Sequence, residues 1–161
     1  MKNKIFVVLV FVSVLLGAGC LQPRTATSYV EEGLKLYEEE KYDQALTKFD
    51  KALEVDPYNY YAWNYKGYSL YYQKKYDDAI KSFDRAIDLK SNSTDPWVGK
   101  GLSLYLQGKY TESLTCFDAA IAVDPNQGHV WYGKGAALAA LGRNTEAQEC
   151  FDKARQLGFE V

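Results

Sequence analysis

The feature that most constrains this chain is a repeat of 34 residues that runs from residue 26 to its end. A phenylalanine marks the interval at Phe49, Phe83, Phe117 and Phe151. Three other positions keep the same step: an aromatic residue (Tyr29, Trp63, Trp97, Trp131), a glycine (Gly33, Gly67, Gly101, Gly135) and an alanine (Ala52, Ala86, Ala120, Ala154). The phase places four repeats at 26–59, 60–93, 94–127 and 128–161. A period of this length indicates small units that are stable only when stacked.

Within each repeat the apolar residues recur at helical spacing, and glycine or polar clusters separate two such stretches. In the second repeat this pattern predicts one helix over Tyr61–Gln73 and another over Asp77–Leu89. A single hairpin of two helices cannot bury both of its faces, so neighbouring hairpins must stack into one continuous core. The small residues let the helices approach closely, and the phenylalanines fill the space between them.

These positions resemble the tetratricopeptide repeat (TPR) family, which places an aromatic residue at position 4, small residues at 8, 20 and 27, an aromatic residue at 24 and proline at 32. Pro57 and Pro125 occupy position 32, while Ser91 and Phe159 replace the proline in repeats 2 and 4. The resemblance implies an all-α fold: a right-handed α-solenoid of four 34-residue TPR helix-turn-helix repeats with a concave face. Lysine stands at position 7 of repeats 2 to 4, where the family prefers leucine, and we expect its amine to lie in water.

In the TPR family, positions 2, 5, 9, 12 and 13 of the first helix face the concave side. Carried over to this chain, they give a tyrosine-rich partner-binding surface: Tyr61, Asn64, Tyr68, Tyr71, Tyr72, Val98, Tyr105, His129 and Tyr132. Tyrosine offers a broad apolar face and one hydroxyl at low conformational cost, which suits a protein or peptide ligand. The same rings suit a glycan or envelope polymer, and position 12 in particular suits packing between helices. The lysines and asparagines with which one TPR subgroup clamps acidic tails are replaced here by Val30, Leu34, Tyr65, Asp95 and Gly99.

The first twenty residues have the organisation of an export signal. Lys2 and Lys4 precede an apolar run over residues 5–16, and small residues follow directly before Cys20. The apolar stretch is shorter than the roughly 20 residues of a membrane span. Gly19 and Cys20 resemble the lipobox of prokaryotic lipoproteins, although Gly17 stands where that motif prefers leucine.

The lipobox resemblance implies a signal peptide over 1–19, a Cys20 that carries a lipid such as palmitate, and a tether over 20–25. The chain is then expected at the extracytoplasmic face of the cell membrane, anchored by that lipid. A secretory signal without lipidation and an uncleaved anchor are the alternatives.

Composition limits the chemistry. With 19 basic and 21 acidic residues, the formal net charge of −2 predicts no binding to nucleic acid. A single histidine and three cysteines give no constellation for catalysis or metal binding, so we expect a non-enzymatic protein without a cofactor. Cys116 and Cys150 lie one repeat apart. Packed helices stand about 8–10 Å apart, and a disulfide needs Cα atoms within about 7 Å, which predicts free thiols.

The C-terminal end is the last feature that the repeat pattern addresses. No polar capping helix follows repeat 4, whose second helix is predicted over Thr145–Leu157. Gly158 is suited to end that helix, and Phe159 to fold back as the apolar contact after it. An uncovered last helix predicts weak self-association through the C-terminal repeat.

Overall fold

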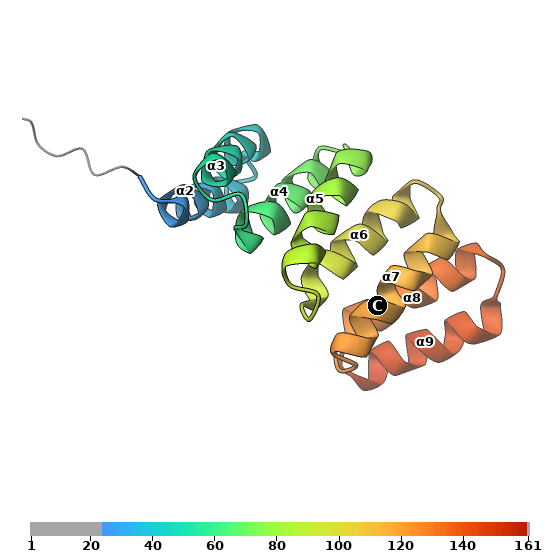
Figure 1. Cartoon of the computed structure of the whole chain (residues 1–161). Coiled ribbons are helices and arrows are strands. Elements are labelled where there is room, and N and C mark those ends of the chain that lie inside the picture. Colours follow the sequence, from blue (N-terminus) through green and yellow to red (C-terminus); the bar gives the residue numbers. More distant parts are fainter. Residues whose placement is uncertain (1–23, 161) are drawn as a thin grey trace, which may run out of the picture.

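The structure is a computed structural model that describes residues 24–160, and in this range the chain forms eight α-helices and no strand. They are α2 (Ala26–Glu38), α3 (Tyr42–Val55), α4 (Tyr60–Tyr72), α5 (Tyr76–Leu89), α6 (Thr94–Leu106), α7 (Tyr110–Val123), α8 (Gly128–Ala140) and α9 (Asn144–Gln156). Each repeat contributes one antiparallel pair, and the pairs stack in chain order (Figure 1). The predicted all-α array of helix-turn-helix repeats is confirmed, with helix bounds that differ by about one residue from the sequence pattern.

Short-range signals set where the helices begin. Asn59 caps α4, because its side-chain oxygen accepts a hydrogen bond from the backbone N–H of Ala62 at 3.0 Å.

The turn inside each repeat needs one left-handed residue. Gly108 fills this position in repeat 3 with φ 76°, whereas Lys74 fills it in repeat 2 with φ 61°. Side chains with a Cβ are strained in this conformation, so the turns of repeats 1 and 2 fold at some cost.

A tryptophan in the first helix fastens the loop between successive repeats. The indole N–H of Trp63 donates to the carbonyl of Pro57 at 2.9 Å, and the same bond joins Trp131 to Pro125 at 2.8 Å. In repeat 3 the indole N–H of Trp97 donates to Ser91, at 3.3 Å. The contact uses a backbone carbonyl rather than the proline ring, which explains why serine is accepted there.

The recurring phenylalanine joins each repeat to the next. Phe83 is completely buried between Gly67 of its own repeat and Gly99 of the following one. A Cβ on Gly67 would lie 2.6 Å from the Phe83 ring, and one on Gly99 would also overlap it. Only glycine therefore leaves space for the ring on both sides. At the first junction Tyr65 replaces that second glycine, and its ring stacks on Phe49 with centroids 6.2 Å apart.

Lysines at position 7 form a ladder of ion pairs across the junctions. Each pairs with an aspartate on the second helix of the preceding repeat at 2.6 Å: Lys66 with Asp50, Lys100 with Asp84 and Lys134 with Asp118. These amines, which were expected in water, are each held in an ion pair at the surface. Their stems pack along the surface, and their side chains are only about one-quarter exposed. Half-exposed pairs of this kind contribute modestly to stability but favour one register between repeats.

The two rows of helices have different neighbours. The first helices of the repeats contact one another in sequence, from α2 to α4, α6 and α8. The second helices of the described repeats contact only first helices. The first helices therefore stand closer together, which places them on the inner, concave side of the stack. None of the described helices is long and apolar enough to cross a membrane.

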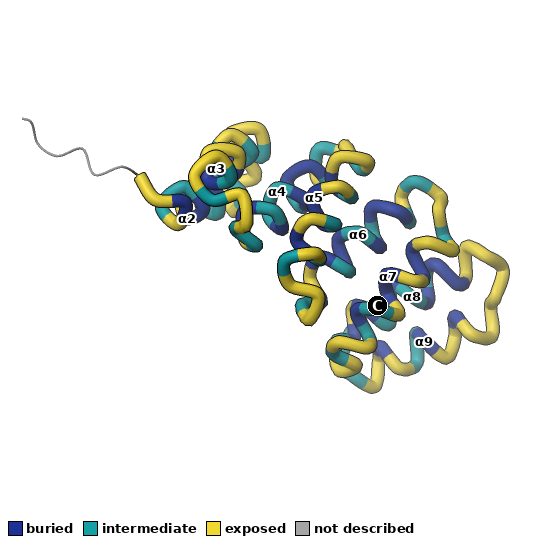
Figure 2. Tube along the Cα trace, in the orientation of Figure 1, coloured by how far each residue is buried: buried dark blue, intermediate teal, exposed yellow. Residues whose placement is uncertain are grey.

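The second helix of the last repeat carries polar side chains where the earlier repeats carry apolar ones. In repeats 1 to 3 two positions on the second helix bury apolar side chains against the next repeat, for example Leu114 and Ile121. In α9 these positions hold Gln148 and Arg155, which are exposed and both donate to Asp152. Figure 2 shows α9 as a largely exposed helix. The uncovered outer face of α9 is thus polar at these two positions, and weak self-association through it stays a prediction.

Phe159 folds back as the sequence predicts. Gly158 adopts φ 80°, and the backbone N–H of Phe159 donates to the carbonyl of Ala154 at 3.0 Å. The Phe159 ring then packs on Tyr132 with centroids 5.3 Å apart. This is the glycine-terminated helix end with its accompanying apolar contact, and the prediction is confirmed.

Candidate partner-binding surface

Tyrosine rings gather where α2, α3 and α4 meet, and we name them the tyrosine cluster: Tyr37, Tyr42, Tyr65, Tyr68, Tyr71 and Tyr72. The rings of Tyr42 and Tyr72 are stacked, with centroids 5.0 Å apart and planes at 9°. Tyr37 lies 5.9 Å from Tyr72 and 5.5 Å from Tyr65. Contacts at these distances add about 0.5–1.5 kcal/mol each beyond burial. The cluster is therefore a rigid aromatic surface rather than a set of separate side chains.

Position 12 of the first helix has a structural role within this cluster. Its tyrosine packs on the tyrosine that begins the second helix of the same repeat, as in Tyr37 with Tyr42 at 5.7 Å and Tyr105 with Tyr110 at 5.4 Å. Tyr71 packs on its counterpart in the same way, at 6.0 Å. One side of each such ring is thus used inside the repeat, and only the remaining side faces outward.

Exposure separates the predicted surface residues into three groups. Tyr61 and Tyr72 are 57% and 51% exposed, and His129 is also exposed. The other predicted tyrosines are half-buried: Tyr68, Tyr71, Tyr105 and Tyr132. Asn64 and Val98 are buried, at 3% and 7% exposure. The structure thus brings the tyrosines of α4 to one accessible face and places Asn64 and Val98 beneath the surface.

Tyr68 connects repeat 2 to repeat 3. Its hydroxyl donates to the backbone carbonyl of Asp95 at 2.9 Å, and its ring meets Phe83 edge-on at 5.0 Å. Burial raises the pKa of Tyr68, and the nearby carboxylate of Asp95 raises it further. Tyr37 also has a raised pKa, mainly through burial. Both hydroxyls therefore stay protonated at physiological pH and act as neutral donors.

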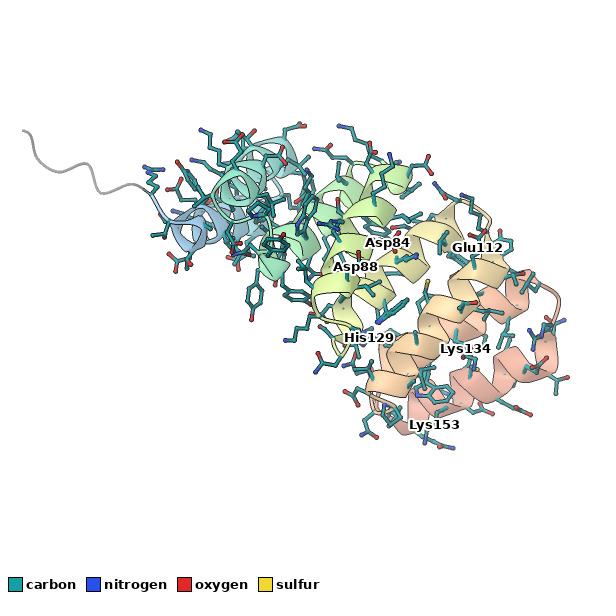
Figure 3. The ribbon with its side chains drawn as sticks, in the orientation of Figure 1. Asp84, Asp88, Glu112, His129, Lys134 and Lys153 are labelled. Atoms are coloured by element: carbon teal, nitrogen blue, oxygen red, sulfur yellow. The ribbon has the colours of Figure 1, made fainter. Side chains whose placement is uncertain are left out.

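A second part of the concave side is an apolar cleft of about 380 Å³ between α6 and α8. We name it the repeat 3–4 cleft, and its lining includes Val98, Leu102, Tyr105, His129, Tyr132, Ala136 and Phe159. Among the residues that the structure describes, no Lys, Arg, Asp or Glu side chain lines it. His129 stands at the start of α8, and Figure 3 shows it and Lys134 on the same helix. A cleft of this composition suits a large apolar side chain of a partner.

A wider cleft of about 580 Å³ is formed by residues of α4 and α5 and has a different character. Its charged groups are already paired: Lys66 with Asp50, and Lys81 with Asp78 at 2.8 Å. Lys66 also stands over the ring of Trp63, 5.2 Å from its centroid. Because its charges are satisfied within the chain, we do not assign it as the partner site.

Sequence reasoning missed Tyr42 and Tyr65. Tyr65 holds position 6, where repeats 3 and 4 carry Gly99 and Gly133, so the departure from glycine was a visible signal. Tyr42 begins a second helix, and a rule based only on first helices cannot select it. Tyr42 belongs to the tyrosine cluster through its contacts with Tyr37 and Tyr72. Tyr65 belongs to it through its contacts with Tyr37 and Tyr68.

Asn64 carries one of the buried polar atoms that have no hydrogen-bond partner within the described residues. Oδ1 of Asn64 is buried and meets no hydrogen-bond donor within the described residues. Such an atom is costly to bury, since it loses water without gaining another bond.

The cysteines of the described range are Cys116 and Cys150, and both are free and buried, as predicted. Burial raises the pKa of Cys116 to about 11, so its thiol is protonated and unreactive at neutral pH. Among residues 24–160 no group of three or more His, Cys, Asp or Glu side chains is placed to hold a metal ion. The lipidation site predicted at Cys20 lies outside the described residues.

Four stacked helix pairs with a continuous inner face define an α-helical repeat scaffold. The chain belongs to the tetratricopeptide repeat family, which it matches over residues 30–94 and 98–158. Folds of this kind mediate interactions between proteins. No curated protein matches the chain.

Solved structures with a similar fold include those of MamA. A crystal structure of MamA superposes with a TM-score of 0.80 at 20% identity, covering 85% of this chain and 80% of that one. MamA from Desulfovibrio magneticus RS-1, from residue 41 to its end, gives 0.78 at 21% identity, covering 83% and 75%. At this level of identity the similarity establishes the fold alone.

Proposed function

We propose that this TPR scaffold binds a protein or peptide partner on its concave side, through the tyrosine cluster, Tyr61 and the repeat 3–4 cleft. The observation that carries the proposal is the exposure of Tyr72 within the cluster and of Tyr61 near the start of α4. Exposed aromatic rings on a concave face are typical of surfaces that bind partners. An apolar cleft on the same side adds a place for an anchoring side chain.

The test is recovery of partners from the envelope fraction of the native host with the full chain as bait. Tyr72→Ser removes an exposed ring from the proposed surface. Tyr58→Ser is the matched control, because Tyr58 is 74% exposed and lies in the loop before α4, outside the concave positions of the first helices. Loss of a partner with Tyr72→Ser alone supports the proposal. Equal recovery with both variants refutes the assignment of the surface.

A glycan or envelope polymer is the alternative ligand, and the exposed tyrosine rings favour it as well, because sugar rings stack on aromatic faces. Retention of the chain on isolated cell-wall polymer, lost in Tyr72→Ser and kept in Tyr58→Ser, would assign the surface to a glycan. Retention unchanged by Tyr72→Ser would exclude this use of the surface.

We further propose that a lipid on Cys20 holds the scaffold at the extracytoplasmic face of the cell membrane. The basic start, the short apolar run and the small residues before Cys20 support this anchor. The test compares intact mass and membrane partitioning of the protein and Cys20→Ser, both made in the native host. A mature mass that begins at Cys20 and includes lipid, lost in the variant, supports the anchor. An unlipidated product that partitions into the aqueous phase refutes it.

A further inference from the structure

The charged side chains at the concave positions of the first helices are all acidic. At positions 2, 5, 9, 12 and 13 of the four first helices, the charged residues are Glu38 and Asp95, and no lysine or arginine occurs there. Both acids are exposed. A partner on this side therefore meets negative charge together with aromatic and apolar groups.

Neither acid is neutralised by its own chain. Within residues 24–160 neither Glu38 nor Asp95 forms an ion pair. The contrast with the second helices is clear, because the aspartates of the ladder, such as Asp50 and Asp84, each hold a lysine at 2.6 Å. The acids of the concave side thus keep their capacity to pair with a cation supplied from outside.

Both acids lie beside tyrosines. The backbone carbonyl of Asp95 accepts from the hydroxyl of Tyr68, and the carboxylates of Asp95 and Glu38 both act on Tyr65, whose pKa burial and then these charges raise. An aromatic face attracts a cation through its quadrupole, most strongly where water is partly excluded. The chain already shows such a contact, since Nζ of Lys90 stands 5.3 Å from the ring centroid of Tyr60. Tyrosine faces and carboxylates together favour a lysine or arginine.

The repeat 3–4 cleft, which could take an apolar side chain of the partner, begins close to Asp95 on α6. Val98, which lines the repeat 3–4 cleft, comes three residues after Asp95 in α6. Three residues of a helix rise about 4.5 Å, so the acid and the edge of the cleft are about one turn apart. A ligand that uses both must carry its basic and its large apolar side chains within a few residues of each other.

We propose that the partner docks a basic segment with a neighbouring apolar anchor: a cation of the segment pairs with Asp95 beside Tyr68, Glu38 attracts further positive charge of the segment, and the anchor enters the repeat 3–4 cleft. This inference rests on the proposed function and specifies its ligand. The lysines and asparagines that hold an acidic tail are absent, and the free acids would repel such a tail.

The test measures fluorescence anisotropy of three short synthetic peptides with the full chain in a neutral maltoside detergent, against detergent alone. The first peptide carries lysines beside a leucine–phenylalanine pair. The second replaces those lysines with glutamates, and the third keeps the lysines but replaces the apolar pair with alanines. We expect the first peptide to bind at least about tenfold more tightly than either of the others, with an affinity that falls as salt is added.

Two charge-neutral variants identify the site. Asp95→Asn and Glu38→Gln keep the size of each side chain and remove its charge. Each substitution is expected to lower the affinity for the basic peptide about threefold. A loss of this size is what removal of one partly exposed charge contact produces. Glu54→Gln is the matched control, because Glu54 is an exposed acid on α3 that lies outside the concave positions. It is expected to leave the affinity unchanged.

The outcomes separate the two proposals. Equal binding of the basic and acidic peptides, lost in Tyr72→Ser, would overturn the charge preference and keep the surface as a peptide site. If Glu54→Gln lowers the affinity for the basic peptide as much as Asp95→Asn does, the peptide responds to the overall charge of the chain, and the assigned site is overturned. Binding of none of the three peptides would overturn both proposals. Dimerisation of the chain, blocked by Tyr72→Ser, would assign the surface to a second copy and overturn the basic-segment proposal.

Discussion

Asn64 offers a substitution whose effect can be worked out from the repeats themselves. Its side chain is 3% exposed, and its Oδ1 has no donor. The equivalent positions of repeats 1 and 3 hold Val30 and Val98, which are buried at 6% and 7% exposure. Valine is thus known to fit this site on the first helix in two neighbouring repeats. Asn64→Val removes the unpaired polar atom and keeps a side chain of similar size.

The expected gain follows from two terms. A buried polar atom without a partner costs about 1–3 kcal/mol, and asparagine and valine have nearly equal helix propensity. Since the exchange changes little else, we expect Asn64→Val to raise the free energy of unfolding by about 1–2 kcal/mol. For a chain of this size each kcal/mol raises the melting temperature by about 4 °C.

The assay is urea unfolding of the full chain followed by far-ultraviolet circular dichroism. The reciprocal substitution Val98→Asn is the control and is expected to lose about 1–3 kcal/mol, since it creates the unpaired group that the first variant removes. If Asn64→Val is less stable than the parent while Val98→Asn behaves as expected, the Asn64 amide gains a bond that this reasoning omits. A variant that is more stable but binds its partner more weakly would show that Asn64 is kept for binding.

Three further predictions concern the turns, the junctions and the thiols. Lys74→Gly should stabilise the chain by about 0.5 kcal/mol in thermal unfolding, because Gly108 already relieves the same left-handed turn without strain; a loss of stability would contradict this. Gly133→Ala should lower the melting temperature by an amount equivalent to about 1–2 kcal/mol, since the new Cβ would lie 2.8 Å from the ring of Phe117; a higher melting temperature would show that the ring can move. Cys116, whose pKa burial raises to about 11, should react with a thiol reagent at pH 8 about a hundredfold more slowly than in urea, and equal rates would show that the site opens readily.

The repeat pattern predicts the fold to within about one residue at each helix end, because each signal is local. A cap such as Asn59, a glycine in a turn such as Gly108, and the helical spacing of apolar residues each act within a few residues of the chain. Even the return of Phe159 follows from Gly158 beside it. The recurrence of these signals every 34 residues then leaves stacking as the only way to bury the apolar faces.

The candidate surface is less accessible to such reasoning. A rule that assigns helix positions to the concave side treats Asn64 and Tyr61 alike. Asn64 is nevertheless buried, whereas Tyr61 is the most exposed of the predicted tyrosines. Which side chain reaches solvent depends on the neighbours that cover it, and these come from other helices. Tyr42 was missed for the same reason, since it joins the surface through its contacts with Tyr37 and Tyr72 on two other helices.

The sequence by itself thus determines the family, the helices and the order of the stack, because each rests on periodic local signals. Only the tertiary structure decides the pairing of charges and the exposure of the tyrosines, because both depend on distances between helices of different repeats. It shows that Lys100 is held by Asp84, while Glu38 and Asp95 form no ion pair within the described residues. That difference, set by which helix faces which, separates the charges that hold the scaffold together from those that remain for a partner.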